Sequence, residues 1–392
     1  MSTLFSPLPM GPLTLANRIV VPPMSQYSAA DDGIATPWHA QHIGGLAISG
    51  AGMVICEANG VTPDGRITPH CLGLWNREQA QALQKLIADI RTYSNTPIGV
   101  QLNHAGRKAG TNAPWRNQGA SLTDSEGGWP TVAPSALAYK PGWRVPQELD
   151  EAGMTRIIDG FVAAAERALN AGVDFIELHA ANGYLLNQFL SPLSNQREDA
   201  YGGSPENRMR FPLQVARALR EAWPKSRPLG VRFNGGEFAD GGLSLDEAVQ
   251  FAGELHALGY DYLHVSGGYN IYHQTPDADQ PGYMVPFAEA VKQALPQAVV
   301  ITVGLIYEAP QAEAIVQHAQ EDSPAPEAAA EAVPAAVAAP EAIPAPESIA
   351  QSVLDAPPAA PAESAPEAAA SADPDSIEAL LARAEEDLRL LR

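Results

Sequence analysis

The stretch Phe175-Ile-Glu-Leu-His-Ala-Ala-Asn-Gly-Tyr184 carries the main fold signal, because an apolar run ends there in a polar cluster. The run has the length and composition of a buried strand, and helical patterns over 154–171 and 206–223 flank it. A strand that is apolar on both faces and lies between helices is typical of a parallel sheet with covered faces. We therefore expect an α/β protein.

The same pattern recurs along residues 1–316. The expected strands are Ile19–Val21, Met53–Cys56, Ile98–Leu102, Phe175–Leu178, Leu229–Phe233, Tyr262–Val265 and Val299–Val303. The expected helices are Trp38–Ile48, Arg77–Tyr93, Met154–Ala171, Glu206–Trp223, Leu245–Leu258, Phe287–Ala294 and Ala309–Val316. Seven such units favour a TIM (β/α)8-type barrel that lacks its eighth βα unit. A doubly wound sheet fits less well, and no GxGxxG follows any strand.

Two long segments depart from the repeat. Residues 103–149, rich in Gly, Pro and Trp, are too long for a plain loop, so we expect them to cap the barrel mouth. After Val316 the composition changes: 25 of the last 76 residues are Ala, 11 are Pro, and the segment carries −12 of the net charge of −21. With few large side chains to bury, residues 317–374 are expected to be a disordered acidic linker.

Residues 375–392 differ from that linker. Asp375-Ser-Ile-Glu378 resembles a capping box, and apolar residues at helical spacing follow it. A short amphipathic helix is expected. Two interpretations stay open: a marginal solvated helix, or a helix that docks on a partner or on the barrel itself.

Composition also limits the function. A net charge of −21 argues against nucleic-acid binding, which depends on cations that neutralise phosphates. Cys56 and Cys71 cannot ligate a four-thiolate iron–sulfur cluster, and no metal site is predicted. The chain has no apolar run of membrane-spanning length and its first residues lack a signal-peptide pattern, so no membrane association and a cytoplasmic location are expected. Homo-oligomerisation stays open.

Polar residues gather where the predicted strands end, which is where βα barrels place their chemistry. They lie in 22–27, 57–59, 101–108 and 177–184, at Arg232, in 266–268 and at Gly304. Gln101 and Arg232 stand inside otherwise apolar strands and need buried partners. One planar ligand with both donors and acceptors would satisfy several of these groups.

Residues 1–316 resemble the old yellow enzyme family of flavin-dependent ene-reductases, most closely the xenobiotic-reductase branch. The resemblance rests on PPMSQYSA, EANGVTPDGRIT, QLNHAGRKA, ELHAANGYLLNQFLSPLSNQREDAYGGSPENRMRF, GVRF and ITVGL, in matching order and spacing. It implies a barrel that holds FMN non-covalently. It also implies that NADPH or NADH is the electron donor, and that the C=C bond of a small α,β-unsaturated carbonyl compound is reduced.

The resemblance also assigns residues. His179 and Asn182 would hydrogen-bond the substrate carbonyl oxygen, and Tyr184 would protonate the α-carbon. Tyr27 and Lys108 would line the substrate pocket. The FMN contacts would be Pro23, Met24, Ser25, Ala58, Gln101, His179, Arg232, Ser266, Gly267 and Gly304. Outside such a motif, a His or Tyr at a strand end is more often structural. For Arg232 the alternative is a role as a buried ion-pair partner.

Three departures from the family pattern bear on activity. Ser25 stands where the branch often has Cys, and the pair at 179 and 182 is His/Asn rather than His/His. The family's eighth strand, whose Gly-Arg pair contributes to the phosphate site, has no counterpart after Gly304. Two hypotheses follow: an FMN-dependent ene-reductase, or a truncated, catalytically impaired flavin barrel that acts as a binding or scaffold protein through its tail.

Overall fold

The computed structural model describes residues 2–272 and 280–321. The chain divides into two units, Met1–Glu327 and Ala328–Arg392, and every described residue belongs to the first. The predicted boundary after Val316 falls inside a helix, α8, which continues to Glu321. The predicted linker beyond that helix and the predicted helix 375–392 lie outside the described residues.

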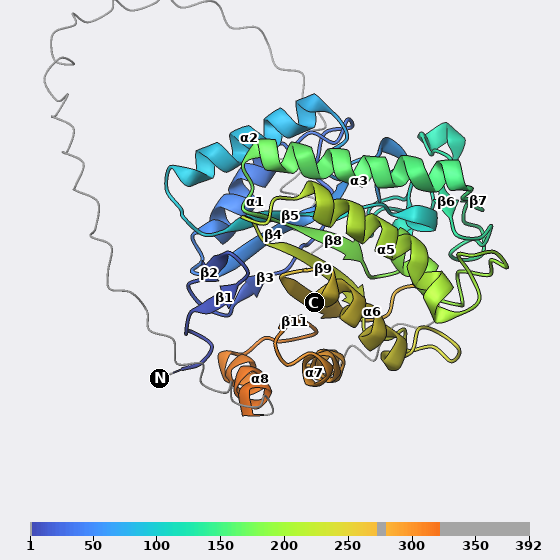
Figure 1. Cartoon of the computed structure of the whole chain (residues 1–392). Coiled ribbons are helices and arrows are strands. Elements are labelled where there is room, and N and C mark those ends of the chain that lie inside the picture. Colours follow the sequence, from blue (N-terminus) through green and yellow to red (C-terminus); the bar gives the residue numbers. More distant parts are fainter. Residues whose placement is uncertain (1, 273–279, 322–392) are drawn as a thin grey trace, which may run out of the picture. The chain divides into compact units, whose positions relative to one another are not determined.

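The core of the first unit is a parallel sheet of seven strands with helices between them (Figure 1). The strand order is β11-β10-β9-β8-β5-β4-β3. The strands are β3 (Val20–Val21), β4 (Met53–Gly60), β5 (Ile98–Asn103), β8 (Phe175–Ala180), β9 (Leu229–Asn234), β10 (Tyr262–Ser266) and β11 (Val299–Thr302). The main helices are α1 (Pro37–Ala47), α2 (Arg77–Arg91), α3 (Glu151–Ala171), α5 (Pro205–Ala222), α6 (Leu245–Ala257), α7 (Val285–Ala294) and α8 (Ala309–Glu321).

The sheet curls into a nearly closed barrel, which confirms the predicted fold. Val20 of β3 and Val299 of β11, from the two edges of the sheet, pack against the same interior cluster that contains Phe175 and Tyr262. Among the described residues, no strand pairs with the outer edges of β3 and β11. Within the described part of the chain, the barrel therefore has a seam between these two strands.

A hairpin that the sequence analysis did not predict closes one end of the barrel. Strands β1 (Leu8–Met10) and β2 (Leu13–Leu15) pair antiparallel. Met10 and Leu15 are fully buried against Phe175 and Tyr262 inside the barrel. The hairpin thus excludes water from the end of the barrel opposite to the polar strand ends.

The segment between β5 and α3, which covers the predicted cap 103–149, is irregular. It contains three short 3-10 helices and a two-stranded sheet of β6 (Val132–Ala133) and β7 (Gln147–Glu148). Its first turn, Gly106–Lys108, contacts the polar strand ends, since the ammonium group of Lys108 donates to the backbone oxygens of Asn182 and Tyr269. No helix in the described part of the chain is long and apolar enough to cross a membrane.

Candidate active site

The end of β8 and the turn after it carry the three predicted catalytic residues at the polar end of the barrel. His179 lies on the strand, Asn182 adopts a left-handed conformation with φ of 56°, and Tyr184 precedes the short buried helix α4 (Leu185–Leu190). Gly183 between them has φ of 71°, and a Cβ there would lie 2.4 Å from the backbone oxygen of Tyr269. Only glycine fits this position, so the turn depends on it.

His179 is held as a neutral hydrogen-bond donor. Its Nδ1 accepts a hydrogen bond from the backbone N–H of Ala181 at 3.2 Å. Burial, helped by the positive charges of Arg232 and Lys108, lowers the pKa of His179 well below its ordinary value. The single ring proton therefore resides on Nε2, which is the nitrogen left to donate to another group.

Tyr184 lies between His179 and Lys108. Its ring meets that of His179 edge-on at 5.0 Å between centroids, and the ammonium nitrogen of Lys108 lies 4.9 Å from its centroid. Burial raises the pKa of Tyr184 far above its ordinary value, so the phenol keeps its proton. Burial and the charge of Arg107 lower the pKa of Lys108 to about 7. The site therefore holds a protonated phenol beside an amine that titrates near neutrality.

Ser266 connects two of the predicted residues at the end of β10. The side-chain amide of Asn182 and the guanidinium group of Arg232 each donate to its hydroxyl at 3.3 Å. The hydroxyl of Ser266 in turn contacts the sulfur of Met284 at 3.8 Å. His179 and Arg232 are also register partners in the sheet. His179, Asn182, Tyr184, Lys108, Arg232 and Ser266 therefore form one connected group.

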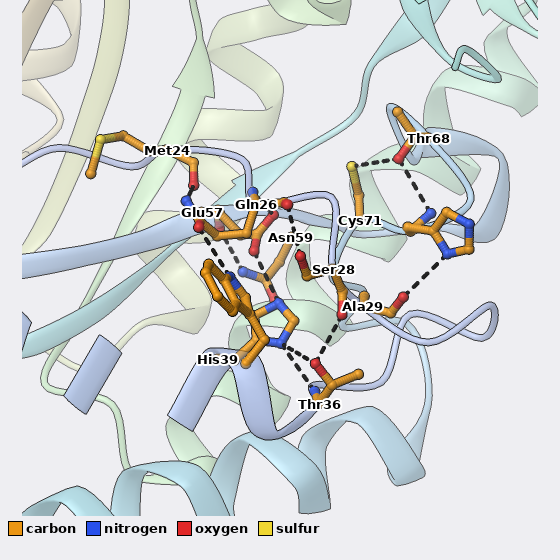
Figure 2. Close-up of polar contacts among 12 residues, drawn as sticks. Met24, Gln26, Ser28, Ala29, Thr36, His39, Glu57, Asn59, Thr68 and Cys71 are labelled. Carbon is orange, nitrogen blue, oxygen red and sulfur yellow. Dashed lines mark hydrogen bonds and ion pairs between the residues drawn. The ribbon is translucent and has the colours of Figure 1, made fainter. Parts of the chain in front are cut away.

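A buried carboxylate, Glu57, holds the segment after β3 by a hydrogen bond to its backbone. The sequence analysis assigned no role to this residue. Glu57 of β4 accepts from the backbone N–H of Gln26 at 3.0 Å and pairs with Nε2 of His39 at 3.2 Å (Figure 2). The backbone N–H of Thr36 donates to Nδ1 of the same histidine, so the Nε2 proton points at Glu57. This network holds the segment that carries Met24, Ser25 and Tyr27.

Tyr27 and Ala58 belong to the surroundings of Tyr184. Both tyrosines pack against a small apolar cluster that includes Ala58 and Cys71. Burial raises the pKa of Tyr27 to about 12, with smaller contributions from Cys71 and Glu57. Tyr27 itself has φ of 53°, a left-handed conformation that is uncommon for a residue other than glycine.

The two predicted glycines have packing reasons for their identity. A Cβ at Gly267 would lie 2.9 Å from Phe287, and one at Gly304, which has φ of 110°, would lie 3.1 Å from Met284. Met284 is the residue that Ser266 contacts, which places Gly304 on that side of the group. Pro23 lies in the segment after β3, next to the exposed Met24.

The barrel interior holds buried polar atoms that have no partner among the described residues. They include Nε of Arg232, Nε2 of His264 and Oδ1 of Asn103. Donors and acceptors are both present, and burying them unpaired costs about 1–3 kcal/mol each. A planar ligand with donors and acceptors on its edge fits this set.

Comparison with known proteins identifies that ligand. The model of the NADH:flavin oxidoreductase / NADH oxidase family matches residues 3–323. The chain belongs to this family. It is 38% identical over 330 residues to the NADPH dehydrogenase of Geobacillus thermodenitrificans, covering 82% of this chain and 88% of the relative. It is 40% identical over 317 residues to the NADPH dehydrogenase of Clostridium acetobutylicum, covering 79% and 86%.

Solved structures of the flavin oxidoreductase family share the fold. Morphinone reductase in complex with tetrahydroNAD aligns with a TM-score of 0.67 and 28% identity over 81% of this chain and 85% of its own. The old yellow enzyme homologue from Zymomonas mobilis aligns with a TM-score of 0.65 and 26% identity over 81% and 86%. The predicted family, enzyme class and cofactors are thereby confirmed: the protein is an FMN-dependent NAD(P)H oxidoreductase of the old yellow enzyme type.

The residues present fit the ring system of FMN. Gln101, the guanidinium group of Arg232 and the unpartnered Nε2 of His264 supply polar groups from three neighbouring regions of the interior. The residues fit the phosphate group of FMN less completely, because the Gly-Arg pair that contributes to the phosphate site in the family does not follow Gly304 in this sequence. The roles of the individual residues toward FMN and substrate remain predictions.

Proposed function

We propose that this oxidoreductase reduces the activated C=C bond of α,β-unsaturated carbonyl compounds. The observation that supports this most is the state of His179: the N–H of Ala181 occupies Nδ1, and the proton on Nε2 is free to donate. A neutral donor next to a protonated phenol suits a substrate on which negative charge develops at a carbonyl oxygen. The structural neighbour morphinone reductase acts, by its name, on morphinone.

Each side chain of the site has a separate role in the proposed reaction. His179 and the Asn182 amide hold the carbonyl oxygen by hydrogen bonds, which draws electron density away from the double bond. FMN, when bound, supplies the hydride that the nicotinamide donor delivers. Tyr184 gives its phenolic proton to the α-carbon. Lys108 contacts the Tyr184 ring and the Asn182 backbone, so it fixes the relative position of the two.

The alternative hypothesis, a catalytically impaired barrel acting through its tail, has less support. The family match extends through residue 323, and the predicted catalytic side chains form a connected group. A barrel without catalysis would place no constraint on the tautomer of His179 or on the position of Tyr184. The tail and a docking role for its last helix remain predictions, because those residues are outside the described part of the chain.

The test is direct. The purified protein is expected to be yellow after gel filtration and to consume NADPH in the presence of 2-cyclohexenone, with cyclohexanone as the product. NADH in a parallel assay establishes the preferred donor. A colourless protein that stays inactive with excess FMN would refute the proposal. A yellow protein that oxidises NADPH with other acceptors but leaves 2-cyclohexenone unchanged would refute only the substrate class.

A further inference from the structure

Glu177 is a fully buried carboxylate inside the barrel. It belongs to a polar layer that also contains Gln101, His264 and Arg232. Its Oε1 accepts a hydrogen bond from the side-chain amide of Gln101 at 2.8 Å, and its Oε2 pairs with Nδ1 of His264 at 2.9 Å. The three residues come from β8, β5 and β10, so the carboxylate connects strands on both sides of its own. Neither the family strings nor the catalytic scheme gives this residue a role.

The bond to Glu177 fixes the orientation of the Gln101 amide. A carboxylate only accepts hydrogen bonds, so the NH₂ group of Gln101 must face Glu177. The amide oxygen of Gln101 takes no part in that bond. Gln101 is therefore held as an acceptor toward any ligand that its oxygen meets, and a ring N–H of a bound flavin is such a donor.

The same argument fixes His264. Its Nδ1 must carry the proton that the carboxylate accepts. Burial lowers the pKa of His264 against the opposing effect of Glu177, so the ring is neutral and its buried, unpartnered Nε2 is an acceptor. Replacing this neutral ring by another neutral group leaves the net charge of the layer unchanged.

Arg232 brings a positive charge to the same layer. It is the register partner of His264 and His179 on β9. Burial lowers the pKa of Arg232, and the charge of Glu177 is the largest of the effects that oppose this lowering. Glu177 thus offsets part of the positive charge that the guanidinium group presents to its surroundings.

We propose that Glu177 is a positioning residue for FMN, which orients the Gln101 amide and, by offsetting the charge of Arg232, sets the reduction potential of the bound flavin. The proposal rests on the assignment of Gln101 and Arg232 to the flavin ring system. It concerns the resting cofactor rather than the chemistry on the enone. Its failure is therefore separable from a failure of the proposed substrate class.

Glu177→Gln tests both parts. Loss of the negative charge leaves Arg232 less compensated, and the reduced anionic flavin becomes more stable relative to the oxidised form. We expect about a tenfold change in that equilibrium, which is about 30 mV upward for a two-electron couple. The new amide must offer its oxygen to His264, so its NH₂ group faces Gln101 and forces that amide to turn. Oxidised FMN should then bind about tenfold more weakly.

The measurements are the midpoint potential of the holoprotein, by titration against a redox dye, and FMN release, by equilibrium dialysis. Glu237→Gln is the matched control, because Glu237 is also buried but bonds to Ser191 and to the backbone of Leu243. The control should leave potential and FMN affinity unchanged. An unshifted potential in Glu177→Gln, or the same shift in Glu237→Gln, would overturn the proposal.

Glu177→Asp covers the case in which the first variant does not fold or loses FMN. The aspartate keeps the charge on a shorter side chain, so the contact with Gln101 is lost while Arg232 stays compensated. We expect weaker FMN binding with a potential close to that of the wild type. A potential that moves as far as a change of charge predicts would contradict the electrostatic part. Unchanged FMN binding would contradict the part that concerns Gln101.

Discussion

Glu313, in the last described helix, accepts a hydrogen bond from the backbone N–H of Thr3 at 2.7 Å. This contact joins the segment before the first strand to the helix that follows β11. The second oxygen of Glu313 accepts from the N–H of Leu4 at 3.0 Å and also from the Ser2 hydroxyl. Among the residues that the structure describes, no strand fills the seam between β3 and β11. A side chain of α8 that captures the N-terminal segment therefore connects the two sides of that seam.

Glu313→Gln should weaken this connection most clearly at neutral pH. The hydrogen bond from Ser2, followed by that from Leu4, lowers the pKa of Glu313 to about 2. A carboxyl group whose pKa is lowered on folding stabilises the protein above its unfolded pKa, and the contribution disappears as the pH falls from about 4.5 toward 2. The melting temperature of the variant should be lower at pH 7 and approach that of the wild type in acid.

Glu308→Gln, at the start of the same helical region, is the control for this measurement. The backbone oxygen of Glu308 accepts from the N–H of Ala312, a bond that the substitution leaves in place. Its replacement should leave the melting temperature unchanged. A Glu313→Gln protein as stable as the wild type at pH 7 would mean that the N-terminal contact does not hold the seam.

Most of the fold was predictable because strand and helix patterns are local. The run at 175–178 predicted β8, and the structure extends it only to Ala180. The hairpin Leu8–Leu15 was missed because each of its strands has three residues, too few for a period-two pattern to stand out. It is specified instead by long-range burial of Met10 and Leu15.

The part of the site that lies within a sequence motif was predictable. The contacts between side chains from strands far apart in the sequence were not. The strings around His179 and Tyr184 marked the end of β8 and the turn after it, and the structure brings these two side chains together. Glu57 and Glu177 were overlooked as a group with their histidines, although an acid inside an apolar strand is itself a signal of a buried partner. The partner, His39 or His264, could not be chosen from the sequence, because the fold alone sets those distances.

Tyr184→Phe should separate the two halves of the catalytic cycle. The phenol is the proposed proton donor, and burial keeps it protonated by raising its pKa. Without it, reduction of 2-cyclohexenone should slow by about 10²-fold or more, which is the usual contribution of general acid catalysis. Reduction of the flavin by NADPH needs no such proton and should keep its rate. Stopped-flow measurement of each half-reaction distinguishes the two, and equal losses in both would contradict the assignment.

His104→Asn should flatten the acid branch of the stability curve. The backbone N–H of Gly106 donates to Nδ1 of His104, and burial lowers the pKa of the ring to about 4. The unfolded chain binds a proton near pH 6.5, so stability is full above that pH and falls as the pH drops toward 4. The lowered pKa of His104 corresponds to a loss of about 3 kcal/mol in the free energy of unfolding over this pH interval.

Chemical denaturation at pH 7 and pH 4.5 measures that loss. Asparagine preserves an acceptor for Gly106 but does not titrate, so His104→Asn should lose less stability between the two pH values than the wild type. His42→Gln, at a partly exposed position of α1, should lose as much as the wild type. If His104→Asn shows the full wild-type loss, the acid sensitivity arises elsewhere, for example at His179 or His264.

Glu57→Gln should loosen the segment that carries Met24, Ser25 and Tyr27. The oxygen of the new amide can accept from Nε2 of His39, but its NH₂ group then faces the backbone N–H of Gln26, and two donors oppose each other. Leaving that N–H without an acceptor costs about 1–3 kcal/mol. Because Tyr27 is in the same segment, the KM for 2-cyclohexenone should rise. Glu221→Gln, on the exposed face of α5, is the control for a lost carboxylate. A Glu57→Gln protein with wild-type stability and KM would show that the carboxylate does not hold the segment.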